Sequence, residues 1–289
     1  MVTNTLQKES PNRLAYQLFY TIAALWLVLA VLFGMFDLKI SQTLVNREAG
    51  WGNWGAAYGE LPGILLMLVA VYVAHSVRPI AATPVKEVTL SILTILISSF
   101  FFYLLLGWLA YHVNPELAKQ YGRYILLGPL AFFIIERSLR KTPVSYPCNI
   151  GHWGVATLLQ GLVCVLLFVQ GFKSFWGRVR FVHLRPDFSD FTPWYLPGPG
   201  GPLAQSFPSG HSALAWMVLP LFLLFVGCRL PVRVAAATVL AGWGIFVSAS
   251  RVAIGAHYAS DVLFASCVSI LCFLLFYIRT ECGTGQNQK

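Results

Sequence analysis

Long apolar stretches separated by short polar segments dominate the chain. A helix needs about 20 apolar residues to cross a bilayer, and six stretches meet or approach that length: Leu14–Phe36, Pro62–Val77, Val88–His112, Trp153–Phe172, Val234–Ser250 and Val262–Ile278. Ser212–Val226 is slightly short, and Tyr124–Ile135 is interrupted by Gly128 and Pro129. The pattern predicts an all-α polytopic transmembrane bundle of about eight spans, in one domain over residues 1–289. A re-entrant or interfacial segment at 124–135 is the alternative.

Composition supports a membrane protein. The chain is 57% hydrophobic and 11% charged with a mean hydropathy of +0.68, which excludes a soluble protein of this length. Its six cysteines show no disulfide or metal-ligand spacing, so we expect no metal and no cofactor. The net charge is +9, but without a Lys/Arg run or a stacking platform it does not favour nucleic acid as a partner. Nothing in the composition predicts an oligomeric state.

The distribution of cations predicts an orientation in a cell membrane. With eight spans and the N-terminus inside, eleven Lys and Arg fall on the inner side and four on the outer side, as the positive-inside rule requires. Five more cations break that bias at the outer side: Lys173, Arg178, Arg180, Arg185 and Arg251. Cations placed where topology disfavours them favour anion binding. We therefore expect a site that faces outward.

Two outer segments are longer than simple connections. Asp37–Leu61 carries Trp51, Trp54 and Tyr58, and amphipathic rings of this kind favour the membrane interface. Lys173–Pro208 is rich in aromatic residues, Pro and Gly, too broken for a helix. Because it joins two polar clusters, we interpret this second segment as a rim or lid over the site.

The first polar cluster to carry a clear chemical signal is Phe207-Pro208-Ser209-Gly210-His211. Ser209 stands where an N-cap belongs, directly before the apolar run 212–226. Backbone amides at a helix start point toward an anion, and Gly210 allows close approach. An ordinary Ser cap beside a hydrogen-bonded interfacial histidine is the alternative.

A second cluster reads Ser250-Arg251, five residues, then His257-Tyr-Ala-Ser-Asp261. On a helix, His257 and Asp261 share a face. A carboxylate bound to one ring nitrogen fixes the tautomer and leaves the other nitrogen free as a nucleophile. The planar fork of Arg251 matches phosphate oxygens. A surface His/Asp pair at a helix start is the alternative.

The third cluster, Lys173 to Arg180, supplies cations. Lys173 alone is typical of a snorkelling anchor, but Arg178 and Arg180 lie beyond it, with Gly177 between. Their expected work is to neutralise a transferring phosphoryl group. The remaining polar residues at span ends are expected to be structural: His75, His112, His152, Glu60 and Glu136. His183, in the predicted lid, is expected to have no catalytic part.

Together the three clusters resemble the type 2 phosphatidic acid phosphatase (PAP2) superfamily, whose pattern is Lys-x6-Arg-Pro, Pro-Ser-Gly-His and Ser-Arg-x5-His-x3-Asp. The second and third motifs match in full, whereas Phe181 replaces the proline of the first. The resemblance covers the last four spans (152–278) as the catalytic core. The first spans (14–139) match nothing recognisable, and their role is open.

The resemblance implies a role for each matched residue. His257 attacks phosphorus and forms a phosphohistidine, Asp261 orients it, and His211 protonates the leaving group and then activates water. Five groups hold the phosphoryl oxygens, with Arg178 assisting: Lys173, Arg180, Arg251, Ser209 and the Gly210 amide. No metal is implied.

The predicted function is hydrolysis of a membrane lipid phosphate or pyrophosphate at the outer, periplasmic face. A phosphotransferase to another lipid is the alternative within the same chemistry, and a transporter for phosphate-bearing solutes is the alternative from another class. The substrate stays open among prenyl pyrophosphate, phosphatidate, phosphatidylglycerophosphate and lipid A phosphate.

Overall fold

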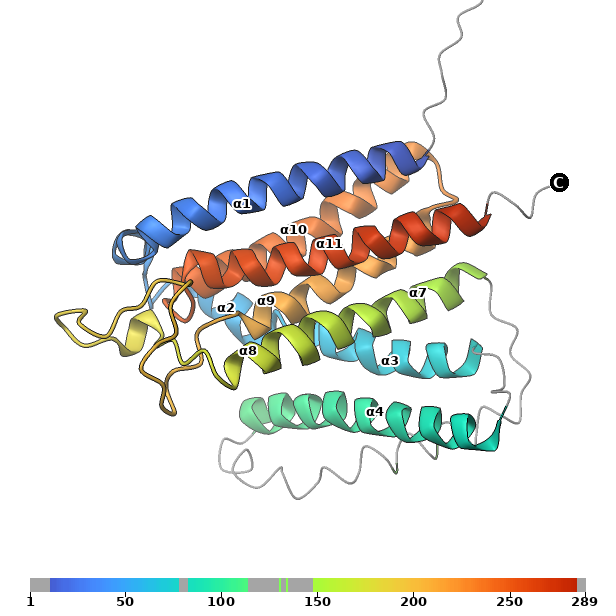
Figure 1. The fold of residues 1–289 in the computed structure, drawn as a ribbon, viewed down its shortest axis with the longest axis horizontal. Helices are drawn as coiled ribbons and strands as arrows, with labels where there is room; N and C mark the ends of the chain where they lie inside the picture. Colours follow the sequence, from blue (N-terminus) through green and yellow to red (C-terminus); the bar gives the residue numbers. More distant parts are fainter. Residues whose placement is uncertain (1–10, 78–82, 114–129, 131–133, 135–147, 285–289) are drawn as a thin grey trace, which may run out of the picture.

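The structure is a computed structural model that describes residues 11–77, 83–113, 130, 134 and 148–284. All regular structure in those ranges is helical: α1 (Pro11–Leu44), α2 (Gly50–Tyr58), α3 (Leu61–Val77), α4 (Pro84–Val113), α7 (Cys148–Gln160), the π-helix η2 (Gly161–Gln170), α8 (Gly171–Lys173), the 3-10 helices η3 (Phe181–His183) and η4 (Trp216–Phe225), α9 (Gly210–Ala215), α10 (Leu230–Ala253) and α11 (Ala259–Thr284). The long helices run side by side along one axis, with α1 and α4 at opposite edges (Figure 1).

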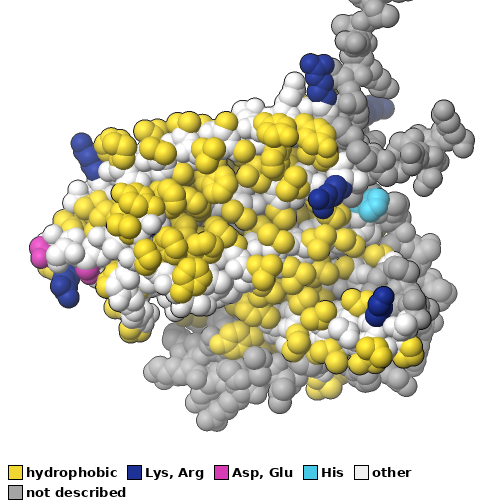
Figure 2. Space-filling view, in the orientation of Figure 1, with side chains coloured by type: hydrophobic (Ala, Val, Ile, Leu, Met, Phe, Trp, Pro, Cys, Tyr) yellow, Lys and Arg dark blue, Asp and Glu magenta, His cyan; other side chains and the backbone are white. Residues whose placement is uncertain are grey.

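Six helical segments are long and apolar enough to cross a membrane: Arg13–Leu44, Gly50–Val77, Pro84–Val113, Asn149–Lys173, Leu230–Ala253 and Ala259–Arg279. Apolar side chains cover the flank of the bundle, and Lys and Arg gather toward its ends (Figure 2). The all-α fold and the multi-pass character are thus confirmed. The count of eight is not: Gly210–Phe225 is a shorter apolar helix, and the span predicted at 124–135 lies outside the described residues except at 130 and 134.

The segment predicted to lie along the interface has a different structure. Residues 37–44 continue α1, and Gly50 to Val77 form one candidate span through α2 and α3. Glycines explain this packing. A Cβ on Gly55 would lie 2.6 Å from the Ser250 side chain, on α10, and a Cβ on Gly63 would lie 2.0 Å from the Leu214 carbonyl oxygen. Small residues let membrane helices approach this closely. At these glycines α2 packs directly against α10, and α3 packs directly against α9.

Residues 174–209 follow their prediction in conformation but not in position. Within this segment only η3 is regular structure, as its Pro and Gly content predicts. Trp194 donates a hydrogen bond from Nε1 to Ala30 O of α1 at 2.7 Å, and its ring lies 4.5 Å from that of Phe264. The segment therefore docks against α1 and α11, and Arg180 is its one residue that lines the cavity described below.

Candidate active site

The start of α9 is built by an N-cap. Ser209 Oγ accepts hydrogen bonds from Ser212 N at 3.3 Å and from Ser212 Oγ at 2.9 Å, and the Ser209 side chain is fully buried. The predicted cap is therefore confirmed. A Cβ placed on Gly210 would lie 3.6 Å from Lys173 Nζ. The cluster 207–211 and the cluster that begins at Lys173 thus meet at the first residue of α9.

A tight turn after α10 carries His257 back toward Arg251. Gly255 adopts φ 72°, a conformation that favours glycine, and His257 N donates to Arg251 O at 3.2 Å. The spacing of five residues between Arg251 and His257 thus corresponds to a helix end plus this turn. His257 precedes α11, so the expectation that it shares a helix face with Asp261 is wrong.

The turn nevertheless brings the two side chains together. Asp261 Oδ2 accepts a 2.9 Å hydrogen bond from Tyr258 N, the N-cap position of α11, as in a capping box. The same oxygen lies 3.5 Å from His257 Nδ1. Both side chains are buried, with His257 1% exposed and Asp261 0%. Because Nδ1 faces the carboxylate, Nε2 is the ring nitrogen left for chemistry.

Arg178 does not lie where the sequence predicted. Its side chain is fully buried, and each nitrogen already has a protein partner: Nε donates to Thr192 O, Nη1 to Ser260 Oγ and Asp261 Oδ1, and Nη2 to Asp37 Oδ2. The contact with Asp261 is 2.6 Å, and the guanidinium carbon lies 4.0 Å from the centre of the Tyr258 ring. Arg178 therefore holds the Asp261 carboxylate in place, and it does not face the cavity as a free cation.

Asp37 of α1 also binds Arg178, although it belongs to none of the three motifs. The side chain is fully buried, and besides Arg178 it accepts hydrogen bonds from Ser260 N at 3.0 Å and from Ser260 Oγ. The available signal was a carboxylate placed directly after an apolar span, where an unpaired charge is costly. Asp37 and Asp261 share the Arg178 guanidinium, which links α1 by hydrogen bonds to the motif that carries His257.

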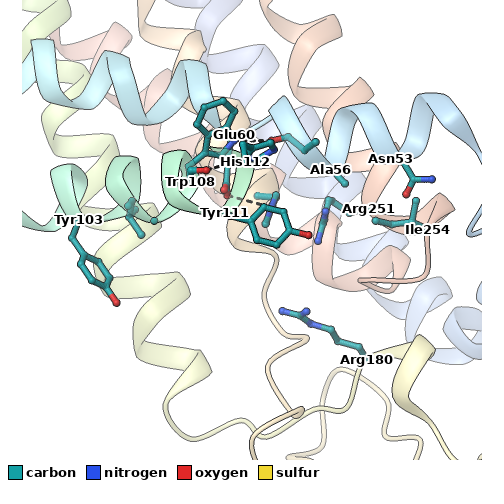
Figure 3. Close-up of a pocket in the computed structure, with 14 residues that line it drawn as sticks. Asn53, Ala56, Glu60, Tyr103, Trp108, Tyr111, His112, Arg180, Arg251 and Ile254 are labelled. Atoms are coloured by element: carbon teal, nitrogen blue, oxygen red, sulfur yellow. Dashed lines mark hydrogen bonds and ion pairs between the residues drawn. The ribbon is translucent and has the colours of Figure 1, made fainter. Parts of the chain in front are cut away.

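A cavity of about 750 Å³ lies beside these groups, between α2, α4 and the ends of α9 and α10. Arg180 enters it from the loop and Arg251 from the end of α10 (Figure 3). The Nε atoms of both arginines are buried and have no hydrogen-bond partner among the described residues. Buried donors are almost always hydrogen-bonded. These two unpaired donors in one cavity therefore favour the binding of an anion there.

His211 also lines this cavity, with its Nε2 3.3 Å from Glu60 Oε2. Glu60 was expected to be structural; it lies at the turn between α2 and α3, and 21% of its side chain is exposed, in the cavity wall. Trp108 and Tyr111 of α4 also line the cavity (Figure 3). His112, also expected to be structural, stacks on Trp108 with ring centres 4.2 Å apart. The helices α2 and α4, with the turn after α2, thus supply most of the described cavity lining.

Burial sets the protonation of the nucleophile candidate. It lowers the pKa of His257 to about 4, against the opposing effect of Asp261 and with the help of Arg251 and Lys173. The imidazole is therefore neutral at neutral pH. Burial also lowers the pKa of Arg180. For Arg178, burial lowers the pKa but the carboxylates of Asp261 and Asp37 more than offset it, so the pKa is raised.

Three of the predicted site residues line the cavity, namely Arg180, His211 and Arg251. His257, Asp261 and Ser209 are buried and do not line the cavity. His257 and Lys173 interact electrostatically with both His211 and Arg251. Arg185 is exposed. In the described part of the chain no group of three His, Cys, Asp or Glu has metal-ligand geometry, and metal independence stays a prediction.

The order and placement of the three clusters agree with known sequences. Residues 152–281 match the sequence profile of the PAP2 superfamily. This part of the chain belongs to that superfamily. All three PAP2 motifs, from Lys173 to Asp261, lie inside the matched range, whereas Asp37 and Glu60 lie outside it. The resemblance stated from the motifs is thereby confirmed.

A curated relative is similar to part of the chain. It is a lipid A 1-phosphatase of Porphyromonas gingivalis, 39% identical over 118 residues. The alignment covers 39% of this chain and 23% of the relative, so this chain matches less than a quarter of that protein's length. No solved structure matches the chain significantly.

Proposed function

We propose that this protein is a membrane lipid phosphatase that works through a phosphohistidine at His257. The observation that carries the proposal is the pair of buried, unpartnered Nε atoms of Arg180 and Arg251, which share one cavity with His211. Membership of residues 152–281 in the PAP2 superfamily and the similarity to a lipid A 1-phosphatase support the same reaction class. Guanidinium groups match phosphate geometry and stabilise its developing charge.

The first step transfers the phosphoryl group to the protein. Nε2 of neutral His257 attacks phosphorus while Asp261 holds Nδ1, the N–P bond forms, and the bond from phosphorus to the lipid oxygen breaks. His211 gives its proton to the departing oxygen, so that an alkoxide is not released. Arg180, Arg251 and Lys173 neutralise the phosphoryl oxygens, together with Ser209 and the Gly210 amide at the α9 start.

The second step releases phosphate. A water molecule gives its proton to His211, its oxygen bonds to phosphorus, and the N–P bond breaks. Inorganic phosphate leaves, and both histidines return to the protonation states in which the cycle began. Arg178 takes no direct part in either step, because its donors are engaged by Asp37, Asp261, Ser260 and Thr192. We assign it the positioning of Asp261.

The cavity and the bundle together support a lipid as the carrier of the phosphate. The cavity continues from the arginines along α4, past Tyr103, Leu104 and Tyr111, in a helix of a membrane-spanning bundle. A headgroup at Arg180 and Arg251 would leave its acyl chains near the hydrocarbon. With the eight spans expected from the sequence, most Lys and Arg fall on the opposite side of the membrane, which favours an outward-facing site in a cell membrane.

Phosphate release by the purified protein in detergent tests the proposal. The panel contains lipid A, phosphatidate, phosphatidylglycerophosphate and a prenyl pyrophosphate, with EDTA present and with His257→Ala as the control. We expect EDTA-resistant release from at least one lipid and none from the variant. Phosphate transfer to an added lipid without release would favour the phosphotransferase. No reaction, or equal release by His257→Ala, contradicts the enzyme and favours a transporter.

A further inference from the structure

A second carboxylate–histidine pair, Glu60 with His211, lies in the wall of the cavity. Glu60 Oε2 lies 3.3 Å from His211 Nε2, and the two side chains are 21% and 29% exposed. Glu60 is the one carboxylate among the described cavity-lining residues. It comes from the α2–α3 turn, outside the range 152–281 that matches the PAP2 superfamily. The superfamily motifs therefore do not account for it.

Helix packing fixes this pair. Gly63 lies three residues after Glu60, and Leu214 lies three residues after His211. A Cβ on Gly63 would come within 2.0 Å of the Leu214 carbonyl oxygen, so the backbones of α3 and α9 lie in direct contact at this point. The contact holds the start of α3 against the start of α9. Glu60 is thus held opposite His211 by backbone packing, which a flexible surface pair would lack.

The positive charges around His211 disfavour its protonated form, and the carboxylate of Glu60 opposes that effect. Burial lowers the pKa of His211 well below its ordinary value, and Arg251, His257, Lys173 and Arg180 lower it further. A general acid has to hold a proton in this surrounding before it can give one away. A negative charge in contact with Nε2 favours the protonated ring. It also keeps a proton on Nε2 and holds the ring in one orientation.

We propose that Glu60 is a positioning residue for His211 in the reaction proposed above, and this inference rests on that function. Glu60 accepts the Nε2–H hydrogen bond and leaves Nδ1–H to protonate the lipid oxygen as its bond to phosphorus breaks. In the second step Nδ1 takes the proton back from water. Each catalytic histidine then has its own carboxylate, one from the superfamily motif and one from the first half of the chain.

Leaving-group dependence separates this role from a structural one. The value of kcat/KM reports the step that forms the phosphohistidine, and only a poor leaving group needs a proton there. We expect Glu60→Gln to lower kcat/KM about 10-fold or more for phosphatidate, whose glycerol oxygen must be protonated. For 4-nitrophenyl phosphate, whose phenolate departs without a proton, we expect less than about a 3-fold change. Glu48→Gln, at an exposed carboxylate before α2, is the matched control and should leave both values unchanged.

A double-mutant cycle tests whether Glu60 acts through His211. In a His211→Ala background, Glu60→Gln should add no further loss, because the group that it positions is gone. Should glutamine at 60 prevent folding, Glu60→Asp keeps the charge and withdraws it by one methylene, and the same contrast between the two esters is expected at smaller size.

Three results would overturn the inference while leaving the phosphatase in place: an equal fall for both esters, unchanged kinetics in Glu60→Gln, or additive losses in the double variant. If the unmodified protein hydrolyses neither ester nor any lipid of the panel, the proposed function fails and the inference fails with it. The two failures are therefore distinguishable in one set of assays.

Discussion

The two histidine–carboxylate pairs differ in how firmly each is held. Asp261 is fully buried and has Arg178, Ser206 and Tyr258 N as partners besides His257. Glu60 contacts His211 alone among the hydrogen-bonded and ion-paired groups described, in a wall open to the cavity. A nucleophile has to keep one orientation, whereas a proton carrier has to exchange with substrate and water. The firmly held pair is thus the one proposed to contain the nucleophile, and the less firmly held pair is the one proposed to carry the proton.

The pairs also differ in origin along the chain. His257 and Asp261 are four residues apart in one superfamily motif, while Glu60 and His211 join the first half of the chain to the second. Asp37 likewise reaches Arg178 across 141 residues. The first helices therefore supply support and cavity lining to a reaction centre whose motifs lie in the last ones.

Replacing the buried carboxylate should have the largest effect. In Asp261→Asn the anion that fixes His257 Nδ1 is lost, and the tautomer with the proton on Nε2 becomes available. We expect kcat to fall about 10³-fold or more, far beyond the effect of Glu60→Gln. The measurement is phosphate release from the preferred lipid of the panel. A similar loss in both variants would contradict the distinction between the two pairs.

Replacing Arg178 should destabilise the protein. Arg178→Ala leaves two buried carboxylates, Asp37 and Asp261, without their shared cation, and removing one partner from a buried pair costs about 3–5 kcal/mol. We expect a lower free energy of unfolding and lost activity. Thermal unfolding in detergent, followed by helical circular dichroism, measures the change in stability. The double variant Asp37→Asn/Arg178→Leu should recover part of it, because one buried charge is then removed with its partner.

Arg180→Ala is the matched comparison for Arg178→Ala. Arg180 lines the cavity with a buried Nε that has no partner in the described chain. Its loss should therefore change stability by less than about 1 kcal/mol and lower kcat/KM about 100-fold. Equal destabilisation by the two variants would contradict the distinction between Arg178, whose nitrogens all have protein partners, and Arg180, whose Nε has none among the described residues.

The pH dependence should show a smaller effect, confined to acid conditions. Burial places the pKa of His257 at about 4, below the ordinary value of about 6.5. The nucleophile is neutral above that value, so kcat/KM, corrected for the titration of the substrate phosphate, should stay level through pH 6.5 and fall only as the pH approaches 4. A fall centred on pH 6.5 would contradict a buried, neutral His257.

The sequence was sufficient for the helical bundle, the Ser209 cap and the convergence of three motifs at one end of the molecule. It was misleading for Arg178, because spacing within an irregular loop does not determine which way a side chain points. Arg178 and Arg180 are two residues apart, yet one is buried against Asp37 and the other lines the cavity.

Asp37 and Glu60 were beyond reach for a different reason. Each acts through a contact with a residue far away in the sequence, and neither lies in a motif. The role of Glu60 depends on the close approach of α3 to α9 at Gly63. That of Asp37 depends on the contact of α1 with the start of α11. A pattern of apolar residues encodes neither contact. The docking of the predicted rim or lid on α1 was equally out of reach, since Trp194 finds its hydrogen-bond acceptor on that helix.

The central claim, phosphoryl transfer through His257, is tested most directly by trapping the intermediate. The protein is mixed with a substrate from the panel labelled with ³²P in its phosphate, quenched with base in detergent, and digested for mass spectrometry. We expect a base-stable, acid-labile phosphoryl group on His257, absent from His257→Ala. It should accumulate in His211→Ala with 4-nitrophenyl phosphate, where departure needs no proton but water is not activated. Label on another residue, or undiminished phosphate release by His257→Ala, would contradict the account.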